Sequence, residues 1–266
     1  MGMIALALAA AFAPEGEILQ PSTAWSVDYA EYSCTLSRSF GSGDGLILLE
    51  LTPQTGGNRL RVSIASKDRG RFPSQGRAVL GAGEGAPPGA PAGDRYYSID
   101  DPVKGRVAMM RTDREVLAPL ATARTLTVRL GDRHVVLAVP QMGAALKALA
   151  DCERDLAGGW GFDLAAIATP PVPAGTPGRW LTNDDYPAEA LRESLSGETG
   201  LLIIVDAAGK PQRCAVTDSS GSTVLDQTAC VLILKRGTFK PATGRDGKAM
   251  TAPWATMFRW ELPGRD

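Results

Sequence analysis

The sequence contains a single histidine, His134, and this scarcity excludes several kinds of chemistry. One histidine cannot provide the Cys/His spacing that is typical of a zinc site. No motif places a serine or cysteine nucleophile for it, and its position after Gly131 and Asp132, a two-residue hairpin signal, indicates a structural or surface role. We therefore expect no catalytic residue, no metal site and no cofactor, and an enzyme that acts through carboxylates alone is the open alternative.

An excess of either charge is also missing. The 28 basic residues are balanced by 29 acidic residues, which gives a net charge of −1. Nucleic acids and anionic lipids are bound by clustered basic side chains, and this sequence has no such cluster. We therefore expect no nucleic-acid partner.

Long apolar runs are absent apart from the first thirteen residues, which end in Ala11-Phe12-Ala13. This run is too short to cross a bilayer, which takes ~20 apolar residues. Its length and its small residues suit a secretory signal peptide, although no basic residue precedes the run. We predict a signal peptide over residues 1–13. An apolar N-terminus of a cytosolic protein, or a start codon assigned too late, are the alternatives.

Cysteine is scarce, and each of the four cysteines falls on a predicted structural element. Cys34 alternates with apolar residues on a strand, and Cys152 lies on the apolar stripe of a helix, so both point to one core. Cys214 lies on a strand and Cys230 on the helix that follows it. We predict the disulfides Cys34–Cys152 and Cys214–Cys230, which suit an oxidising compartment. The alternative is four buried free thiols.

The clearest boundary is the segment 169–178, in which four of ten residues are proline and two are glycine. Such a composition predicts an extended spacer without helix or sheet. We therefore predict one domain over residues 14–168 and a second over residues 179–266. A second low-complexity stretch, residues 81–93, predicts a long surface loop inside the first domain.

The first domain is predicted to be rich in β-structure. Short alternating apolar runs are typical of strands, and a helical stripe at 141–157 predicts a helix that closes the domain. The runs lie near 32–40, 45–52, 59–65, 95–99, 105–111, 124–130 and 133–139. The residues of this domain do not identify a family.

The second domain reads as helix, strand, strand, helix, strand, which makes the whole chain α+β. We expect the first helix to begin at Pro187 and to end at Gly197. Thr223 and Asp226 predict a capping box for the second helix. The strands predict a three-stranded antiparallel sheet, and the last strand, 250–261, places Trp254, Phe258 and Trp260 on one face, most simply as core residues.

Five short motifs follow one another in this domain. They are Tyr186-Pro187, Gly209, Ser219-Ser220-Gly221, Leu225-Asp226 and Phe239-Lys240-Pro241-Ala242. Each is common by itself, but their order and spacing, from about Arg179 to Pro263, resemble the C-terminal domain of the TonB family. These proteins are the periplasmic energy transducers of Gram-negative bacteria.

The resemblance implies a periplasmic domain with two helices on a three-stranded sheet that binds a partner and performs no chemistry. In the family, this domain captures an extended peptide of an outer-membrane receptor by strand addition, and inner-membrane proton-motor subunits drive the process. By resemblance, the binding edge here is the last strand, where Pro253 suits an edge position. Its predicted residues are Met250, Thr251, Ala252, Trp254, Ala255, Thr256 and Met257.

This chain departs from the family pattern in one respect: it has a folded domain where the transducers have a membrane helix and a long spacer. Peptide binding, more than force transmission, is therefore the expected function. Two alternatives remain open. The first domain carries a sensing or enzymatic activity, or the exposed edge of the second domain forms a homodimer.

Overall fold

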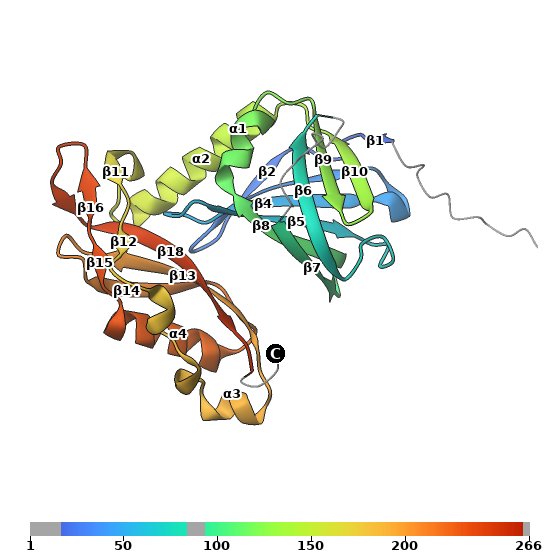
Figure 1. Cartoon of the computed structure of the whole chain (residues 1–266). Coiled ribbons are helices and arrows are strands. Elements are labelled where there is room, and N and C mark those ends of the chain that lie inside the picture. Colours follow the sequence, from blue (N-terminus) through green and yellow to red (C-terminus); the bar gives the residue numbers. More distant parts are fainter. Residues whose placement is uncertain (1–16, 84–93, 263–266) are drawn as a thin grey trace, which may run out of the picture. The chain divides into compact units, whose positions relative to one another are not determined.

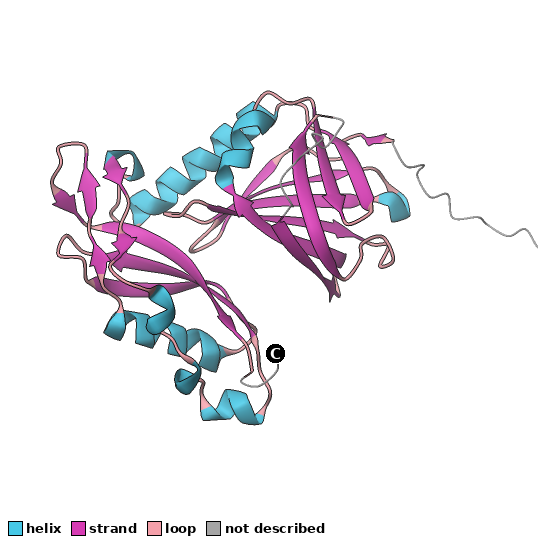
Figure 2. Cartoon of the chain, in the orientation of Figure 1, coloured by secondary structure: helices cyan, strands magenta, loops and turns pink. Residues whose placement is uncertain are grey.

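The computed structural model describes residues 17–83 and 94–262, so the predicted signal peptide at 1–13 lies outside the described residues. The fold is α+β with strands predominating (Figure 2). The chain forms two compact units, and neither is one continuous segment. Within the described residues, the first unit holds 17–26, 36–51, 61–83 and 94–146, and the second holds 27–35, 52–60 and 147–262.

A ten-stranded sheet occupies the first half of the chain (Figure 1). Its strands are β1 (Ile18–Leu19), β2 (Ser26–Tyr29), β3 (Cys34–Phe40), β4 (Ile47–Pro53), β5 (Arg59–Ser66), β6 (Gln75–Ala82), β7 (Asp94–Asp101), β8 (Gly105–Asp113), β9 (Thr125–Leu130) and β10 (Arg133–Ala138). They lie in the order β1-β10-β9-β6-β7-β8-β5-β4-β3-β2. β1 pairs in parallel with β10, and β10 pairs antiparallel with β9.

The segment that follows β1 contacts the end of β3, which lies far from β1 in the strand order. Pro21 forms a bridge with Phe40, and the backbone N–H of Gly41 donates to the carbonyl of Gln20 at 2.9 Å. β1 therefore pairs with β10, and the residues that follow it, Gln20 and Pro21, contact the end of β3. Alternate residues along the strands are fully buried, as the pleat of a strand requires, and they fill the interior: Leu36, Phe40, Ile47, Leu49, Leu51, Leu60, Val62 and Ile64.

The predicted runs of this region correspond to β3, β4, β5, β7, β8, β9 and β10, and the predicted helix corresponds to α2 (Met142–Gly159). A short helix, α1 (Leu117–Leu120), and the strands β1, β2 and β6 were not predicted. β6 overlaps the start of the predicted loop 81–93, whose residues 84–93 lie outside the described residues. Its alternation is masked by glycine: a Cβ at Gly76 would lie 3.0 Å from the Tyr96 ring, so this strand position uses a glycine to admit a neighbour's side chain.

The second unit contains a three-stranded antiparallel sheet with the order β14-β13-β18. Its elements are α3 (Ala188–Arg192), β13 (Gly197–Val205), β14 (Pro211–Asp218), α4 (Thr223–Arg236) and β18 (Ala252–Trp260). α4 lies across the sheet (Figure 1) and buries Leu225, Ala229 and Ile233 in a core shared with β13. This core positions the residues of the candidate site.

The proline-rich segment is not a free spacer, which corrects the prediction for residues 169–178. β11 (Ile167–Thr169) pairs with β16 (Ala242–Gly244), which also pairs with β17 (Ala249–Met250). β12 (Val172–Pro173) pairs with β15 (Phe239–Lys240), and Thr238 exchanges hydrogen bonds with Ala174. Proline is compatible with this pairing because its carbonyl still accepts hydrogen bonds and its fixed φ suits an edge strand.

The first helix of this unit is shorter than predicted. α3 ends at Arg192, and Ser194 adopts a left-handed backbone with φ of 52°. Gly197 does not end the helix but begins β13, which is a correction. A Cβ at Gly197 would lie 2.4 Å from the carbonyl oxygen of Ser220, so the glycine is needed for a close approach of two backbone segments.

Candidate functional site

The motif residues Tyr186 and Pro187 anchor the start of the C-terminal fold. Tyr186 is buried, its hydroxyl donates to the carbonyl of Leu195, and its ring meets Trp260 edge-on with centroids 5.4 Å apart. Burial raises the pKa of the Tyr186 hydroxyl. Pro187 is the N-cap of α3 and not part of its first turn, a shift of one position from the prediction. Tyr186 thus ties the short helix to β18.

Gly209 and Phe239 bring two further motifs together. Gly209 has φ of 81° in the turn between β13 and β14, and a Cβ there would lie 2.0 Å from the carbonyl oxygen of Phe239. The N–H of Phe239 donates to the Gly209 carbonyl at 2.9 Å, and Pro241 borders the same turn. The Phe239 ring contacts Trp254 with centroids 4.9 Å apart. The turn glycine and the Phe-x-Pro motif are therefore one structural feature.

Asp226 is buried and organises the entry to α4. Its carboxylate accepts hydrogen bonds from the Thr199 hydroxyl at 2.8 Å, from the Ser219 hydroxyl, and from the backbone N–H of Ser220 at 2.9 Å. The predicted capping box is wrong, because Ser222 is the N-cap of α4 and accepts from the N–H of Leu225. The motif aspartate instead fixes the segment that contains Ser219 and Ser220.

The pKa values of Asp226 and Asp185 lie below the ordinary range for different reasons. Burial by itself raises the pKa of Asp226, but the hydrogen bonds from Ser219 and the other donors outweigh it and lower the pKa. Asp185 receives two hydrogen bonds from the Arg236 guanidinium, at 2.6 and 2.8 Å, and they are the main cause that lowers its pKa. Arg236 also donates to the carbonyl of Trp180, so this pair connects α4 to the segment before α3. Both carboxylates have structural partners.

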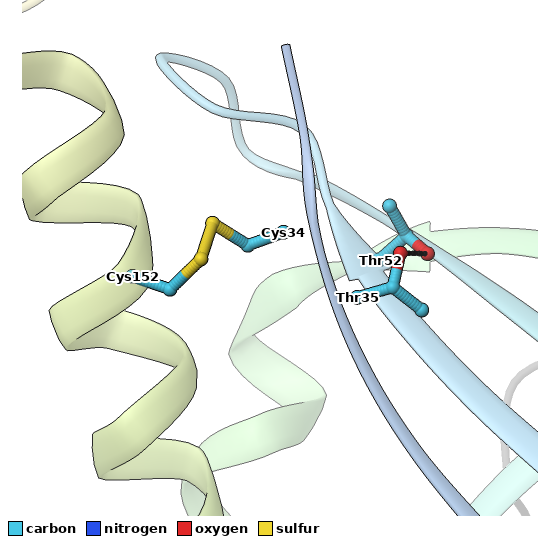
Figure 3. Close-up of a disulfide and its surroundings, with 4 residues drawn as sticks. All are labelled: Cys34, Thr35, Thr52 and Cys152. Carbon is cyan, nitrogen blue, oxygen red and sulfur yellow. Dashed lines mark hydrogen bonds between the residues drawn. A yellow bond between two sulfur atoms is a disulfide. The ribbon is translucent and has the colours of Figure 1, made fainter. Parts of the chain in front are cut away.

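Both predicted disulfides are confirmed. Cys34 and Cys152 join β3 to α2 with their Cα atoms 6.2 Å apart (Figure 3). Cys214 and Cys230 join β14 to α4 with their Cα atoms 5.6 Å apart. None of the four cysteines is free. The second disulfide joins β14, the edge strand opposite β18, to α4, the helix that covers the sheet.

The predicted binding edge is mostly β18. This strand pairs with β13 over nine residues, from Ala252 opposite Val205 to Trp260 opposite Gly197, and it is the last strand of its sheet. Met250 belongs to β17 and Thr251 lies between the two strands, so these two residues are corrections to the predicted edge. The remaining predicted residues all lie on β18: Ala252, Trp254, Ala255, Thr256 and Met257. As predicted, Trp254, Phe258 and Trp260 belong to the core.

Comparison with protein families matches residues 182–262 to the C-terminal domain of the Gram-negative bacterial TonB protein. The matched segment contains all five motifs together with the three strands and both helices of the C-terminal sheet. The chain carries a TonB C-terminal domain. No curated protein and no solved structure matches the chain.

The TonB C-terminal domain is associated with transport and is not enzymatic in its family. Across residues 17–83 and 94–262, no three side chains of histidine, cysteine, aspartate and glutamate come together in a group that could hold a metal ion. His134 is exposed on β10. In the part of the chain that the structure describes, no helix has both the length and the apolar character of a membrane span.

The sequence did not indicate that a distant segment lies on β18 of the TonB C-terminal domain. The turn between β4 and β5 reaches this strand, where the Gln54 side-chain amide donates to the carbonyl of Thr256 at 3.2 Å. Gly56 and Gly57 lie against Pro253 and Ala255. The adjacent glycines signal a tight turn, but no local pattern predicts its contact partner 202 residues away.

Proposed function

We propose that the TonB C-terminal domain of this protein captures an extended peptide by strand addition at the outer edge of β18. The observation that carries this proposal is the position of β18, a nine-residue strand at the end of its sheet. An edge strand presents backbone N–H and C=O groups to an incoming strand, and such pairing gives affinity without any chemistry. The partner would be a segment of an outer-membrane receptor, as for the family.

The side chains of β18 favour recognition through the backbone. Trp260 is buried in the core, and Trp254 and Phe258 are half-buried and pack against it, so most of their ring surface is used within the domain. Pro253 lacks an N–H, which limits the hydrogen bonds that one position of the edge can form. The peptide would then pair with the main chain of β18, and its own alternating side chains would set the register.

The same proposal places the protein in the envelope of a Gram-negative bacterium. The two disulfides suit an oxidising compartment such as the periplasm, to which a signal peptide at residues 1–13 would direct the chain. Transport across the envelope would further need inner-membrane proton-motor subunits, with which this protein would act as a TonB-like component.

An NMR titration of the whole chain tests the proposal. The ligands are synthetic peptides with the N-terminal sequences of outer-membrane receptors from the same organism. We expect saturable amide shifts along residues 252–260. A peptide that is N-methylated at alternate residues keeps its side chains but loses half of its backbone donors, so it should not bind. Shifts confined to other strands, or equal binding of the methylated peptide, would argue against strand addition at β18.

A further inference from the structure

The turn between β4 and β5, residues 54–58, lies on the strand proposed to bind the peptide. Two backbone hydrogen bonds of 2.9 Å build the turn: the N–H of Gln54 donates to the carbonyl of Arg59, and the N–H of Gly57 donates to the carbonyl of Gln54. The Gln54 side chain then extends from this turn to the Thr256 carbonyl. Turn and strand belong to the same compact unit.

The approach of the turn to β18 depends on glycine. Gly56 has φ of 78°, and a Cβ at this position would lie 2.8 Å from both Cβ and Cγ of Pro253. A Cβ at Gly57 would lie 3.3 Å from Cβ of Ala255. The turn therefore packs against the side chains of alternate residues of β18, Pro253 and Ala255, beside the Thr256 carbonyl that accepts from Gln54.

The strand before the turn, β4, is hydrogen-bonded to β3 close to the first disulfide. The hydroxyls of Thr35 and Thr52 lie 3.0 Å apart and form a hydrogen bond between β3 and β4, next to the Cys34–Cys152 bridge (Figure 3). Thr52 and Thr55 are both buried. The disulfide thus anchors β3, and the hydrogen bond between Thr35 and Thr52 joins β3 to the end of β4 at which the turn begins.

One feature would lower the free-energy cost of moving the turn away from β18. Within the part of the chain that the structure describes, the buried hydroxyl of Thr55 has no hydrogen-bond partner. A buried polar group without a partner is unfavourable, and exposure to water would satisfy it. A movement of the turn that exposes Thr55 to water would satisfy its hydroxyl, which would offset the loss of the hydrogen bond between Gln54 and Thr256.

We propose that residues 54–57 are an internal cover of the peptide-binding edge, and that an extended peptide can pair with β18 only after this cover has moved away. This inference rests on the proposed function for its ligand, although the cover itself can be tested without one. A cover lowers the apparent affinity for the peptide by the fraction of molecules in which the edge is open. The N-terminal region would in this way regulate capture by the C-terminal domain.

The first test is hydrogen–deuterium exchange of the whole chain, followed by mass spectrometry over residues 252–258. Gly56→Ala cannot keep both its backbone conformation and its contact with Pro253. We expect this variant to exchange the segment about fivefold faster than the wild type, which corresponds to the loss of one typical hydrogen bond. Gly43→Ala is the matched control, since Gly43 also has a positive φ, of 58°, but its Cβ would meet nothing within 4 Å. Equal exchange in all three proteins would overturn the cover.

A second variant, Gln54→Ala, leaves the backbone of the turn unchanged and removes only the hydrogen bond to Thr256. Gln20→Ala is its control, because Gln20 makes a similar amide-to-carbonyl bond, to Ile18. Only Gln54→Ala is expected to speed exchange at 252–258. If Gly56→Ala fails to fold, the comparison of Gln54→Ala with Gln20→Ala is the test. Equal exchange rates at 252–258 in these two variants would overturn the proposal that residues 54–57 cover β18.

The affinity for the receptor peptides separates the two proposals. We expect Gly56→Ala and Gln54→Ala to bind about fivefold more tightly than the wild type, with both controls unchanged. Identical affinities in all variants would overturn regulation by the cover while the proposed function stands. Absence of binding to every variant, with faster exchange in the two test variants, would contradict the proposed function and support the cover.

Discussion

The hydroxyl of Thr199 donates a hydrogen bond of 2.8 Å to Asp226, and both side chains are buried. The same oxygen accepts a hydrogen bond of 3.1 Å from the indole N–H of Trp260. One relay therefore joins β18, β13 and α4, the three elements that surround the core. A charged acceptor makes the hydrogen bonds of such a relay stronger than neutral ones. The motif aspartate is thus explained by its structural partners.

Replacement of Thr199 by valine should reduce the free energy of unfolding by about 2–3 kcal/mol. Valine keeps the shape, but it leaves the Trp260 N–H without its acceptor and takes one donor from a buried carboxylate. Denaturation monitored by tryptophan fluorescence, with the disulfides intact, measures the change. Thr223→Val is the control because Thr223 is exposed at the start of α4, and it should change stability by no more than about 0.5 kcal/mol. Similar losses of unfolding free energy in both variants would show that the hydrogen bonds of Thr199 do not stabilise the fold specifically.

Stability should decline as the pH falls, and Asp185 should account for part of the decline. Its pKa is lowered in the folded state by Arg236, so the folded state binds a proton there less readily than the unfolded chain. The contribution is complete above the ordinary aspartate pKa of about 4, and it is lost as the pH falls below that value towards the folded-state pKa. Asp185→Asn should therefore show a shallower loss of melting temperature between pH 5 and pH 2. Asp184→Asn, at an exposed neighbour, should follow the wild-type curve.

The sequence predicted best what depends on neighbours in the chain. The alternating runs around Cys34, the helical stripe that contains Cys152 and the turn at Gly209 are local patterns, and all three are present in the structure. The TonB motifs could also be recognised in the sequence because the contacts of each motif lie within one small domain. Even there, the cap of α4 was assigned wrongly, since Ser222 and Thr223 are both good caps by composition and the helix uses Ser222.

The sequence could not predict contacts that depend on the path of the whole chain. Val172 and Pro173 carry no signal for pairing with β15, because an edge pair of two residues has no period to detect. Gln54 and Thr256 are 202 residues apart in the sequence, so no local pattern relates them. The cover of β18, and with it the regulatory proposal, is for this reason visible only in three dimensions.

Removal of the Cys214–Cys230 disulfide by the double change Cys214→Ser and Cys230→Ser should cost about 3 kcal/mol. The bridge closes a loop with a sequence separation of 16, and the chain-entropy model gives this value for a loop of that size. The corresponding change at Cys34 and Cys152, with a separation of 118, should cost between about 4 and 5 kcal/mol. Urea denaturation of both variants compares the two values. An equal or reversed order would show that strain or residual structure outweighs loop entropy.

Two glycines with similar backbone conformations allow a test of what the turn glycine of the TonB motif does. Gly209 and Gly221 have φ of 81° and 88°, so alanine at either position costs about 1–2 kcal/mol for a left-handed backbone. Only Gly209 also lacks space, since its Cβ would lie 2.0 Å from the Phe239 carbonyl oxygen, whereas a Cβ at Gly221 meets nothing within 4 Å.

Gly209→Ala should therefore destabilise the domain clearly more than Gly221→Ala, with a total of about 3 kcal/mol or more against about 1–2 kcal/mol. The steric conflict would force apart the turn and the segment that carries Phe239, whose ring packs between Trp180 and Trp254. A matching change in tryptophan fluorescence should appear in Gly209→Ala alone. Equal unfolding free energies for the two variants would mean that the turn can shift to admit a methyl group, and that backbone conformation alone explains the glycine in this motif.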